Sequence, residues 1–392
     1  MLFKMLPWEY GIRNLFRRPL RSILTLAGLT TVLLLVLLVV GFIRGLEKTL
    51  EVSGHPGTAL VFSLGMGENL EYSSIPMRSS ELVAASVPGI REIRGKKYVS
   101  PELYLGTQVG VQDEVSGQTL ETLGLVRGVT QAALLVREKI ELESGNWPRT
   151  NEVMVGKLAA AKLGVREESL AIGKTLQLEN REWKIAGFFS AGGSAFESEI
   201  WCRLDDLQQS MKRQDLSLVA LKLAAEGDFS DIDLFCKQRL DLELQAMQEI
   251  DYYEMLQRDY QPVRWLAWLV VGLVGGSGIF AGLNTMYGAV VGRVQELAML
   301  RTLGFGRRAI ALSLVQEALI LSVSASLIAA FLAIVLLNGI AIRFTMGAFQ
   351  LEVDSQTVLV GCFAGLLLGM VGAIPPAIRA LRIKIVEGLR AV

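Results

Sequence analysis

The chain has 392 residues, of which 51% are hydrophobic, and its mean hydropathy of +0.41 exceeds what a soluble domain of this length needs. Its 39 basic and 39 acidic residues cancel, but residues 44–264 hold 25 basic and 33 acidic side chains. The remainder holds 14 basic and 6 acidic side chains, placed as short basic segments between long apolar runs. This distribution excludes an ordinary soluble protein and is typical of a membrane protein with a separate acidic domain.

Four uncharged runs are long enough to cross a bilayer as helices, which takes about 20 apolar residues. They are Ser22–Ile43, Trp265–Gly292, Ala318–Ile342 and Ser355–Ile378. The first run is too long for the apolar part of a signal peptide, and no small-residue cleavage site follows it, so we expect a retained anchor. The predicted transmembrane helices, in a 1+3 arrangement, are 22–43, 265–292, 311–337 and 355–378.

Basic residues set the predicted topology. Thirteen of the 14 basic residues outside 44–264 can be placed on one side of the membrane, and only Arg343 cannot. By the positive-inside rule that side is the cytoplasm. It would hold an amphipathic segment at 1–21, a loop at 293–310 and a tail at 379–392. The acidic segment 44–264 and a loop at 338–354 would lie outside, with both termini in the cytoplasm of a bacterial inner membrane.

The segment 44–264 has the pattern of a mixed α/β domain. Predicted strands are Thr58–Leu64, Tyr98–Val111 and Thr175–Phe189, the last folded around a turn at Glu179–Asn180. Predicted helices are Ser79–Ser86 before Pro88–Gly89, Val155–Leu163 capped by Gly164, Leu204–Lys212 and Ile232–Glu249. The last helix would continue into the second span as a rigid stalk, with a kink at Pro262.

Candidate catalytic chemistry is sparse. The only histidine, His55, has no Cys or carboxylate at metal-ligand spacing and no paired nucleophile, so we expect neither a metal site nor a catalytic triad. Gly173-Lys174-Thr175 is similar to the end of a phosphate-binding loop, but Glu168 stands where such a loop needs glycine. We expect this segment to be a turn that leads into a strand.

The three cysteines indicate little. Cys362 lies in the fourth predicted span, where we expect it to pack. The sequence leaves open whether Cys202 and Cys236 form a disulfide, because spacing alone does not decide pairing.

Small and polar residues within the predicted spans support two further hypotheses. The second span carries small residues at helical spacing, which let helices approach closely: Gly272, Gly276, Gly278 and Gly282. They serve either packing within the chain or dimerisation with a second copy. Glu317, near the cytoplasmic end of the third span, either has a proton or substrate role or pairs with Arg308 or Arg21.

The loop between the second and third spans carries the sharpest pattern. It predicts a short amphipathic helix ended by Gly304, with one stripe formed by Val294, Leu297, Ala298 and Arg301. A plain connector between spans needs only a few polar residues. The predicted helix is therefore either a docking surface or a helix that lies on the lipid.

At this loop the sequence resembles the MacB/FtsX/LolE superfamily of type VII ABC-transporter permeases. The resemblance rests on Gly282-x-Asn284-x-Met286, on Arg293-x-x-Glu296 through Arg307-Arg308, on residues 11–22, on residues 376–390, and on Glu152–Gly156 with Trp183–Phe188. Gln295 departs from the usual charged residue, and Pro375–Pro376 doubles the expected proline. Similar segments follow the family order along nearly the whole chain.

The resemblance implies a non-catalytic permease subunit. ATP and Mg²⁺ would be held by a separate cytoplasmic ABC ATPase, and no cofactor by this chain. It implies an ATPase-coupling helix formed by Arg293, Glu296, Leu297, Met299, Leu300, Arg301, Leu303 and Gly304. It implies a second ATPase contact at Arg379, Arg382 and Glu387. The outer segment would be a MacB-like periplasmic domain, porter-like at about 50–126 and 201–260, with an inserted subdomain at about 127–200.

Two functions follow as hypotheses. The first is export or extraction of a hydrophobic, lipid-like substrate or a lipoprotein by a homodimer, with a periplasmic adaptor or lipoprotein acceptor as a further partner. The second is FtsX-like signal transmission that regulates an extracytoplasmic enzyme. The large outer domain favours the first. No nucleic acid is expected as a partner, and the substrate cannot be read from the residues.

Overall fold

A computed structural model describes residues 8–17, 19–67, 69–112, 118–179, 181–344 and 347–382. The chain divides into two compact units, each described here by itself. The helical unit consists of Met1–Arg44, Pro262–Gly339 and Leu351–Val392, and the sheet unit of Gly45–Gln261 and Ile340–Gln350.

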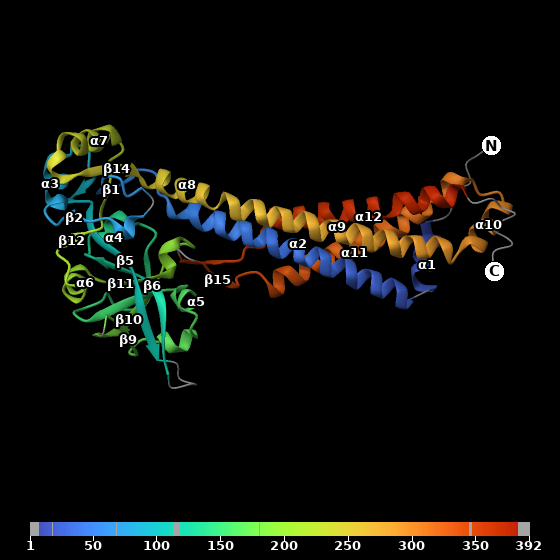
Figure 1. Cartoon of the computed structure of the whole chain (residues 1–392), viewed down its shortest axis with the longest axis horizontal. Coiled ribbons are helices and arrows are strands. Elements are labelled where there is room, and N and C mark those ends of the chain that lie inside the picture. Colours follow the sequence, from blue (N-terminus) through green and yellow to red (C-terminus); the bar gives the residue numbers. More distant parts are fainter. Residues whose placement is uncertain are drawn as a thin grey trace. The chain divides into compact units, whose positions relative to one another are not determined.

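Long apolar helices dominate the helical unit (Figure 1). Four of the described helices are long and apolar enough to cross a membrane: α2 (Pro19–Ser53), α9 (Gln261–Val291), α11 (Arg307–Leu336) and α12 (Ser355–Arg382). Two shorter helices are α1 (Trp8–Arg17) and α10 (Val294–Thr302). The third apolar run is longer than its helix, because α11 ends at Leu336 and residues 341–342 belong to a strand.

Small residues let α2, α11 and α12 pack closely. Leu33 and Leu37 of α2 are buried in one cluster with Ala325 and Ala329 of α11. A Cβ at Gly365 of α12 would lie 1.9 Å from the hydroxyl of Ser326, so only glycine fits this contact. Close backbone approach is the main source of packing energy between helices in lipid.

One ten-stranded sheet forms the centre of the sheet unit, in the order β14-β1-β13-β5-β6-β11-β8-β10-β7, with β9 paired to β10 and β5. The strands, coloured blue to yellow in Figure 1, are β1 (Thr58–Ser63), β5 (Val99–Gln112), β6 (Thr119–Val129), β7 (Glu141–Gly145), β8 (Glu152–Gly156), β9 (Thr175–Leu178), β10 (Arg181–Ser190), β11 (Glu199–Arg203), β13 (Leu218–Lys222) and β14 (Leu244–Gln248). Short two-stranded pairs are β2 (Ile75–Pro76) with β12 (Asp215–Leu216), and β3 (Glu92–Ile93) with β4 (Lys96–Lys97).

Helices cover this sheet and close its core. They are α3 (Ser79–Ser86), α4 (Ala133–Val136), α5 (Ala159–Leu163), α6 (Leu204–Met211), α7 (Phe229–Gln238) and α8 (Glu249–Asp259). Trp183, Ile185 and Leu207 are among the fully buried side chains of the core. Strands β6–β11 and β8–β10 are parallel, and the other pairs in the sheet are antiparallel.

Most of the predicted elements of this unit are confirmed. The helix Ser79–Ser86 has its predicted bounds, and Gly164 adopts the left-handed conformation that ends α5. The turn at Gly173 leads into β9, as expected. Glu179 has φ +48 between β9 and β10, whereas Asn180 lies outside the described residues. The start of the predicted helix Val155–Leu163 was wrong, because 155–156 complete β8 in the sheet.

The predicted helix Ile232–Glu249 is confirmed only in its first part, as far as Gln238. Helix α7 ends at Gln238, Glu243 takes φ +47, and residues 244–248 form strand β14. β14 pairs with β1, where Leu60 faces Met247. A buried ladder of backbone hydrogen bonds outweighs the helical propensity of this segment.

The predicted stalk into the second span is interrupted. Helix α8 ends at Asp259, and α9 begins at Gln261, with Tyr260 (φ −84, ψ 1) between them. Pro262 lies in the first turn of α9, where the missing N–H is tolerated, so it does not kink a helix. The break precedes the proline.

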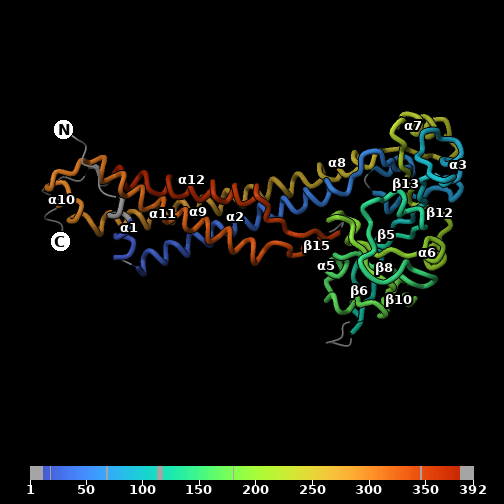
Figure 2. Tube along the Cα trace, turned by 180° about the vertical axis from the view of Figure 1, so that it is seen from behind, coloured from blue at the N-terminus to red at the C-terminus, as the bar shows by residue number. Residues whose placement is uncertain are grey.

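The segment between α11 and α12 is not a plain loop. It forms a hairpin of β15 (Ala341–Phe344) and β16 (Gly347–Gln350), with Ala341 facing Gln350. The hairpin belongs to the sheet unit, although the helices before and after it belong to the helical unit (Figure 2).

Candidate functional site

Helix α10 is the predicted coupling helix, and the structure confirms a short helix there. It covers Val294–Thr302, and Gly304 takes φ +91 after it, a conformation that favours glycine. Leu297 and Ala298 are buried, and Leu297 packs with Ile310 and Leu314 of α11. One side of α10 is therefore fixed to the helical unit.

The other side of α10 exposes large apolar side chains. Met299 is 59% exposed and Leu303 68% exposed, one helical turn apart. Arg307 and Arg308 are also exposed at the start of α11. An apolar pair beside cationic side chains is a common composition for a protein-docking surface.

The eight predicted coupling residues divide into three groups. Met299, Leu303 and Gly304 are exposed, and Glu296, Leu300 and Arg301 are partly buried. Leu297 and Arg293 are buried inside the unit, so neither side chain is available for docking in this conformation.

Arg293 is buried because it pairs with Glu317. Its Nη1 and Nη2 donate to Oε2 and Oε1 of Glu317 at 2.9 and 3.0 Å. Asn14 of α1 donates its Nδ2 to the same Oε2 at 2.8 Å. All three side chains are nearly inaccessible to solvent. We name this group the inner latch.

The inner latch corrects the partner expected for Glu317. Arg308 is exposed, and Arg21 donates to the carbonyl of Thr285 in α9. Glu317 instead joins α11 to the residue that starts α10 and to the N-terminal helix α1. Sequence spacing gave no indication of a partner 24 positions upstream.

The second predicted ATPase contact is only partly described. The guanidinium of Arg379 lies over the ring of Tyr287, 5.6 Å from its centroid. The side chain of Arg382 and the whole of Glu387 lie outside the described residues.

The four glycines of the second span do not act alike. A Cβ at Gly278 would lie 2.8 Å from Val32 of α2, and Gly282 lies beside Gly372 of α12. Nothing lies within 4 Å of the Cβ positions of Gly272 and Gly276. Two of the glycines thus serve packing within the unit, and two face open space.

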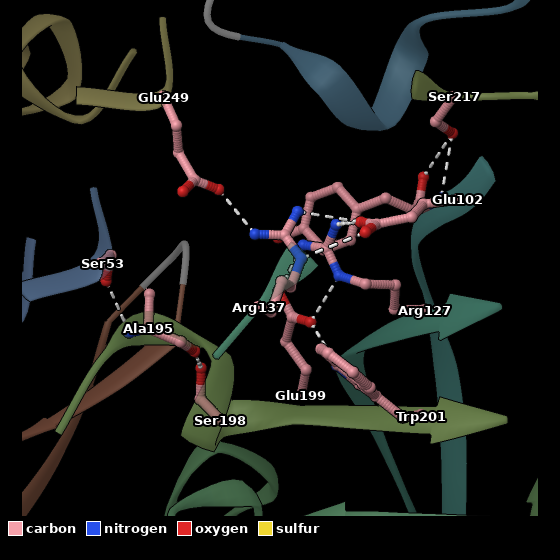
Figure 3. A network of polar contacts seen from close by, with 11 residues as sticks. Ser53, Glu102, Arg127, Arg137, Ala195, Ser198, Glu199, Trp201, Ser217 and Glu249 are labelled. Atoms are coloured by element: carbon pink, nitrogen blue, oxygen red, sulfur yellow. Dashed lines mark hydrogen bonds and ion pairs between the residues drawn. The ribbon is translucent and has the colours of Figure 1, made fainter. Parts of the chain in front are cut away.

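A second polar cluster lies inside the sheet unit and was not predicted (Figure 3). Arg127 of β6 donates to both oxygens of Glu199 on β11 at 2.7 and 2.6 Å, and to Glu102 on β5 at 2.7 Å. The indole of Trp201 donates to Glu199 at 2.7 Å. We name this group the outer network.

Arg137 extends the outer network to α8. It donates to both carboxylate oxygens of Glu102 at 3.0 Å, and it also pairs with Glu249, the first residue of α8, at 2.5 Å. In Figure 3 the two guanidinium groups lie side by side above Glu199. The ring of Phe196 packs against both, with 4.3 Å from Arg137 and 5.3 Å from Arg127 to its centroid.

Mutual pairing sets the charges of the outer network. Burial by itself raises the pKa of Glu102, but the adjacent Arg137 and Arg127 outweigh it, and the pKa of this carboxyl lies below its usual value. Burial also raises the pKa of Tyr253 well above the ordinary range, with a further contribution from Glu249. The carboxylate of Glu102 and the two guanidinium groups are therefore ionised at neutral pH, and the phenol of Tyr253 is neutral.

The same region holds the outer end of α2. The Ser53 hydroxyl accepts from the backbone N–H of Ala195 at 2.8 Å, and Lys139 donates to the carbonyl of Val52 at 2.8 Å. The N–H of His55 donates to Glu249 at 3.3 Å. The last residues of α2 are thus bonded to segments beside the outer network, and the loop after α2 is bonded to its Glu249.

A small cavity borders the outer network. A cavity of about 30 Å³ lies beside it, lined by tyrosines, leucines and the two arginines. His55 contacts Glu138 at 4.0 Å and its own loop. Among the described residues, no group of three His, Cys, Asp or Glu side chains is arranged to hold a metal ion.

The cysteines are free thiols. Cys202 and Cys236 are both buried, and Cys202 lies 3.9 Å from the carbonyl of Arg127. Burial, with a contribution from Asp233, raises the pKa of Cys236 to about 12. The structure therefore contains no disulfide between them. Cys362 is partly buried in α12.

Two family models match most of the chain. Residues 22–232 match the MacB-like periplasmic core domain, and residues 268–385 match the FtsX-like permease C-terminal domain. An uncharacterized ABC transporter permease, YknZ of Bacillus subtilis (strain 168), is 20% identical over 403 residues and covers 97% of both chains.

Solved structures with similarity to this chain match it only in part. The periplasmic region of MacB from Actinobacillus actinomycetemcomitans has a TM-score of 0.40 and 11% identity, and it covers 52% of this chain and 94% of its own. The extracellular domain of the transporter YknZ from Gram-positive bacteria has a TM-score of 0.37 and 14% identity, with 48% and 99% covered.

The family models cover both the mixed α/β segment and the last three long helices, in the order that the sequence predicted. The four membrane-length helices agree with a multi-pass membrane protein. The chain belongs to the MacB/FtsX-like family of ABC transporter permeases.

Proposed function

We propose that this permease converts ATP hydrolysis by a separate ATPase subunit into movement of its sheet unit, and thereby exports or extracts a hydrophobic, lipid-like substrate or a lipoprotein. The observation that carries the proposal is the exposed side of α10. Met299 and Leu303 present apolar surface next to Arg307 and Arg308, in the loop assigned to the cytoplasm by its positive charge.

The inner latch supports a transmitting role for α10. A force applied to the exposed side of α10 would reach α11 through the buried Leu297 and through the pair of Arg293 with Glu317. Asn14 would carry the same displacement to α1. Rigid side-chain contacts of this kind are required if docking is to move the spans rather than only α10.

We propose that the permease acts as a homodimer in the bacterial inner membrane, with both termini in the cytoplasm. Helix α9 is the least covered of the four long helices, with 6% of its most apolar window buried, against 22 to 39% for the others. Gly272 and Gly276 leave an open strip on it. A second copy placed there would find a surface on which two helices can approach closely.

The test uses the full chain in nanodiscs, together with a candidate ABC ATPase subunit from the same organism. Met299→Asp and Leu303→Asp place a charge on the apolar side of α10, and we expect each to reduce ATPase co-purification and stimulated hydrolysis at least tenfold. The matched control is Leu240→Asp, at a residue of the sheet unit that is 79% exposed. Normal binding by both α10 variants would reject the docking assignment.

The same preparation separates transport from signal transmission. Export or extraction predicts ATP-dependent release of labelled lipid or lipoprotein from the membrane. FtsX-like transmission predicts no release, and ATP-dependent activation of a hydrolase encoded in the same gene cluster. The second outcome would keep the coupling helix and replace the proposed substrate role.

A further inference from the structure

The hairpin of β15 and β16 is part of the sheet unit's core. Ala348 and Phe349 are completely buried. At Gly347, which has φ +155, a Cβ would lie 2.7 Å from the hydroxyl of Ser198. Two antiparallel helices need only two to eight connecting residues. Because the side chain of Phe349 is fully buried in the sheet unit, the hairpin does more than connect α11 to α12.

A buried lysine is bonded to the last residue of β15. Lys162 of α5 is 5% exposed and donates its Nζ to the carbonyl of Phe344 at 3.0 Å. Burial, and then the charge of Arg343, lower the pKa of Lys162, which Glu71 partly restores. A cationic side chain is costly to bury without partners, so its position indicates a specific attachment of the hairpin to α5.

Aromatic contacts attach the hairpin to the end of α8. The ring of Phe344 lies edge-on to Tyr260, 5.7 Å between centroids, and also to Phe349, at 5.5 Å. Tyr260 is the residue at which α8 and α9 are interrupted. The hairpin therefore contacts the sheet unit where one of its two long helical connections begins.

The base of the hairpin is closed within the helical unit. The N–H of Gly339 donates to the carbonyl of Leu351 at 2.9 Å, and the N–H of Glu352 donates to the carbonyl of Gly41 in α2 at 3.3 Å. Arg44 pairs with Asp354 at 2.9 Å. The two ends of the hairpin are thus bonded to each other, and a backbone bond and this ion pair tie the end at Glu352 and Asp354 to α2.

Two glycines of α2, one in each unit, leave room for the end of β16 and for the residue that follows it. In the helical unit, a Cβ at Gly41 would lie 2.6 Å from the side chain of Leu351. In the sheet unit, a Cβ at Gly45 would lie 2.3 Å from the carbonyl oxygen of Gln350. The approach at Gly45 is to backbone, so a larger residue there must displace the hairpin.

We propose that this hairpin is a second mechanical connection between the units, which transmits displacement of α11 and α12 directly to the sheet unit. The inference rests on the proposed function, since it concerns how the ATPase-driven motion is delivered. The chain passes between the units at four places, two of them at the ends of the hairpin. With its base closed and Phe349 buried, the hairpin can transmit both pulling and pushing, which a slack loop cannot.

The experiment breaks the link without cutting the chain. Residues 340–350 are replaced by a Gly-Ser segment of equal length, and point variants Phe349→Ala and Gly45→Val weaken the same contacts. The matched control is Phe363→Ala, an aromatic of α12 that is 63% exposed. Each full-length chain is assembled with the ATPase, and amide hydrogen exchange is compared between nucleotide-free and vanadate-trapped complexes.

In the wild type and in Phe363→Ala we expect trapping to change exchange at 159–164 and 195–198, which pack against the hairpin. In the Gly-Ser, Phe349→Ala and Gly45→Val chains we expect this change to fall at least threefold while ATPase binding is retained. An undiminished change in a folded Gly-Ser chain would overturn the inference alone. A wild-type chain that binds no ATPase would overturn the proposed function and this inference with it.

Discussion

Arg293 and Glu317, 24 positions apart, form a two-pronged buried ion pair, with Nη1–Oε2 at 2.9 Å and Nη2–Oε1 at 3.0 Å. Because Arg293 precedes α10 and Glu317 lies in α11, the pair ties the start of the predicted docking helix to α11. Breaking such a pair leaves one uncompensated buried charge, which costs about 3–5 kcal/mol.

The first prediction uses this pair. Arg293→Glu and Glu317→Arg should each lower the thermal unfolding midpoint and the ATPase stimulation of the full chain. The double exchange should recover a substantial part of both, because it restores opposite charges. Asn14→Ala should lower the free energy of unfolding by less than either single exchange, about 1–2 kcal/mol, since it removes one hydrogen bond to a charged group. Unchanged single variants, or a double variant worse than both, would contradict the pairing.

The second prediction concerns the two sides of α10. Leu297→Ala should destabilise the helical unit by about 2–5 kcal/mol, because it opens a cavity between α10 and α11. Leu303→Ala, the exposed control, should change stability by less than about 0.5 kcal/mol. Thermal unfolding in detergent measures both. Equal losses would mean that α10 is not oriented as described.

The third prediction concerns the outer network. Arg127→Met should destabilise the sheet unit by about 3–5 kcal/mol, because Glu102 and Glu199 lose their shared partner. Arg239→Met removes an exposed, solvent-screened ion pair with Asp241 and should leave the stability of the sheet unit nearly unchanged. Urea unfolding of the full chain, followed by tryptophan fluorescence, distinguishes the two. A small loss of stability in Arg127→Met would show that the outer network contributes little to the stability of the sheet unit.

The fourth prediction is a pH dependence of stability. The adjacent Arg137 and Arg127 hold the pKa of Glu102 in the folded chain below its ordinary value, so the folded state binds fewer protons on this group than the unfolded state. Its stabilising contribution is complete above about pH 5 and is lost as pH falls through the folded pKa. Glu102→Gln should therefore flatten the stability profile below pH 5, whereas Glu167→Gln, at an exposed site, should not.

The fifth prediction concerns the thiols. Native full-length chain should react with N-ethylmaleimide at neither Cys202 nor Cys236, since both are buried. The pKa of Cys236, raised to about 12, also leaves little thiolate near neutral pH. After denaturation without reductant, all three cysteines should be labelled, as mass spectrometry would show. Labelling of only one would reveal a disulfide.

Local chemistry made several elements predictable from the sequence. The four long helices follow from runs without charge, and α3 and α5 end where proline or glycine ends them. The turn before β9 follows from Gly173. Each of these signals lies within a few residues of the structure that it determines.

Features that depend on distant partners were not predictable in the same way. The sequence pattern at β14 predicts a helix, because nothing near it in the sequence indicates pairing with β1, which lies far upstream. The hairpin at 340–350 was taken for a loop because its burial comes from α5 and Ser198. Arg293 was assigned to the docking surface because nothing nearby in sequence indicates Glu317. The outer network joins β5, β6, α4, β11 and α8, and no spacing rule connects these elements.

The two-part division of the outer segment at about 127 and 200 stays a prediction. Strands from both proposed parts belong to one sheet, since β9 of the inserted part pairs with β5 of the porter-like part.

The place of β1 in that sheet has a consequence for biosynthesis. Both of its neighbours are late in the chain: β13 begins at Leu218 and β14 ends at Gln248. At about 5–20 residues per second, β14 is made roughly 10–40 s after β1. During that interval the first strand has both edges unpaired, next to the newly inserted first span. A nascent chain of this kind needs protection from aggregation until its last strand emerges, so slower translation before residue 248 should lower its yield.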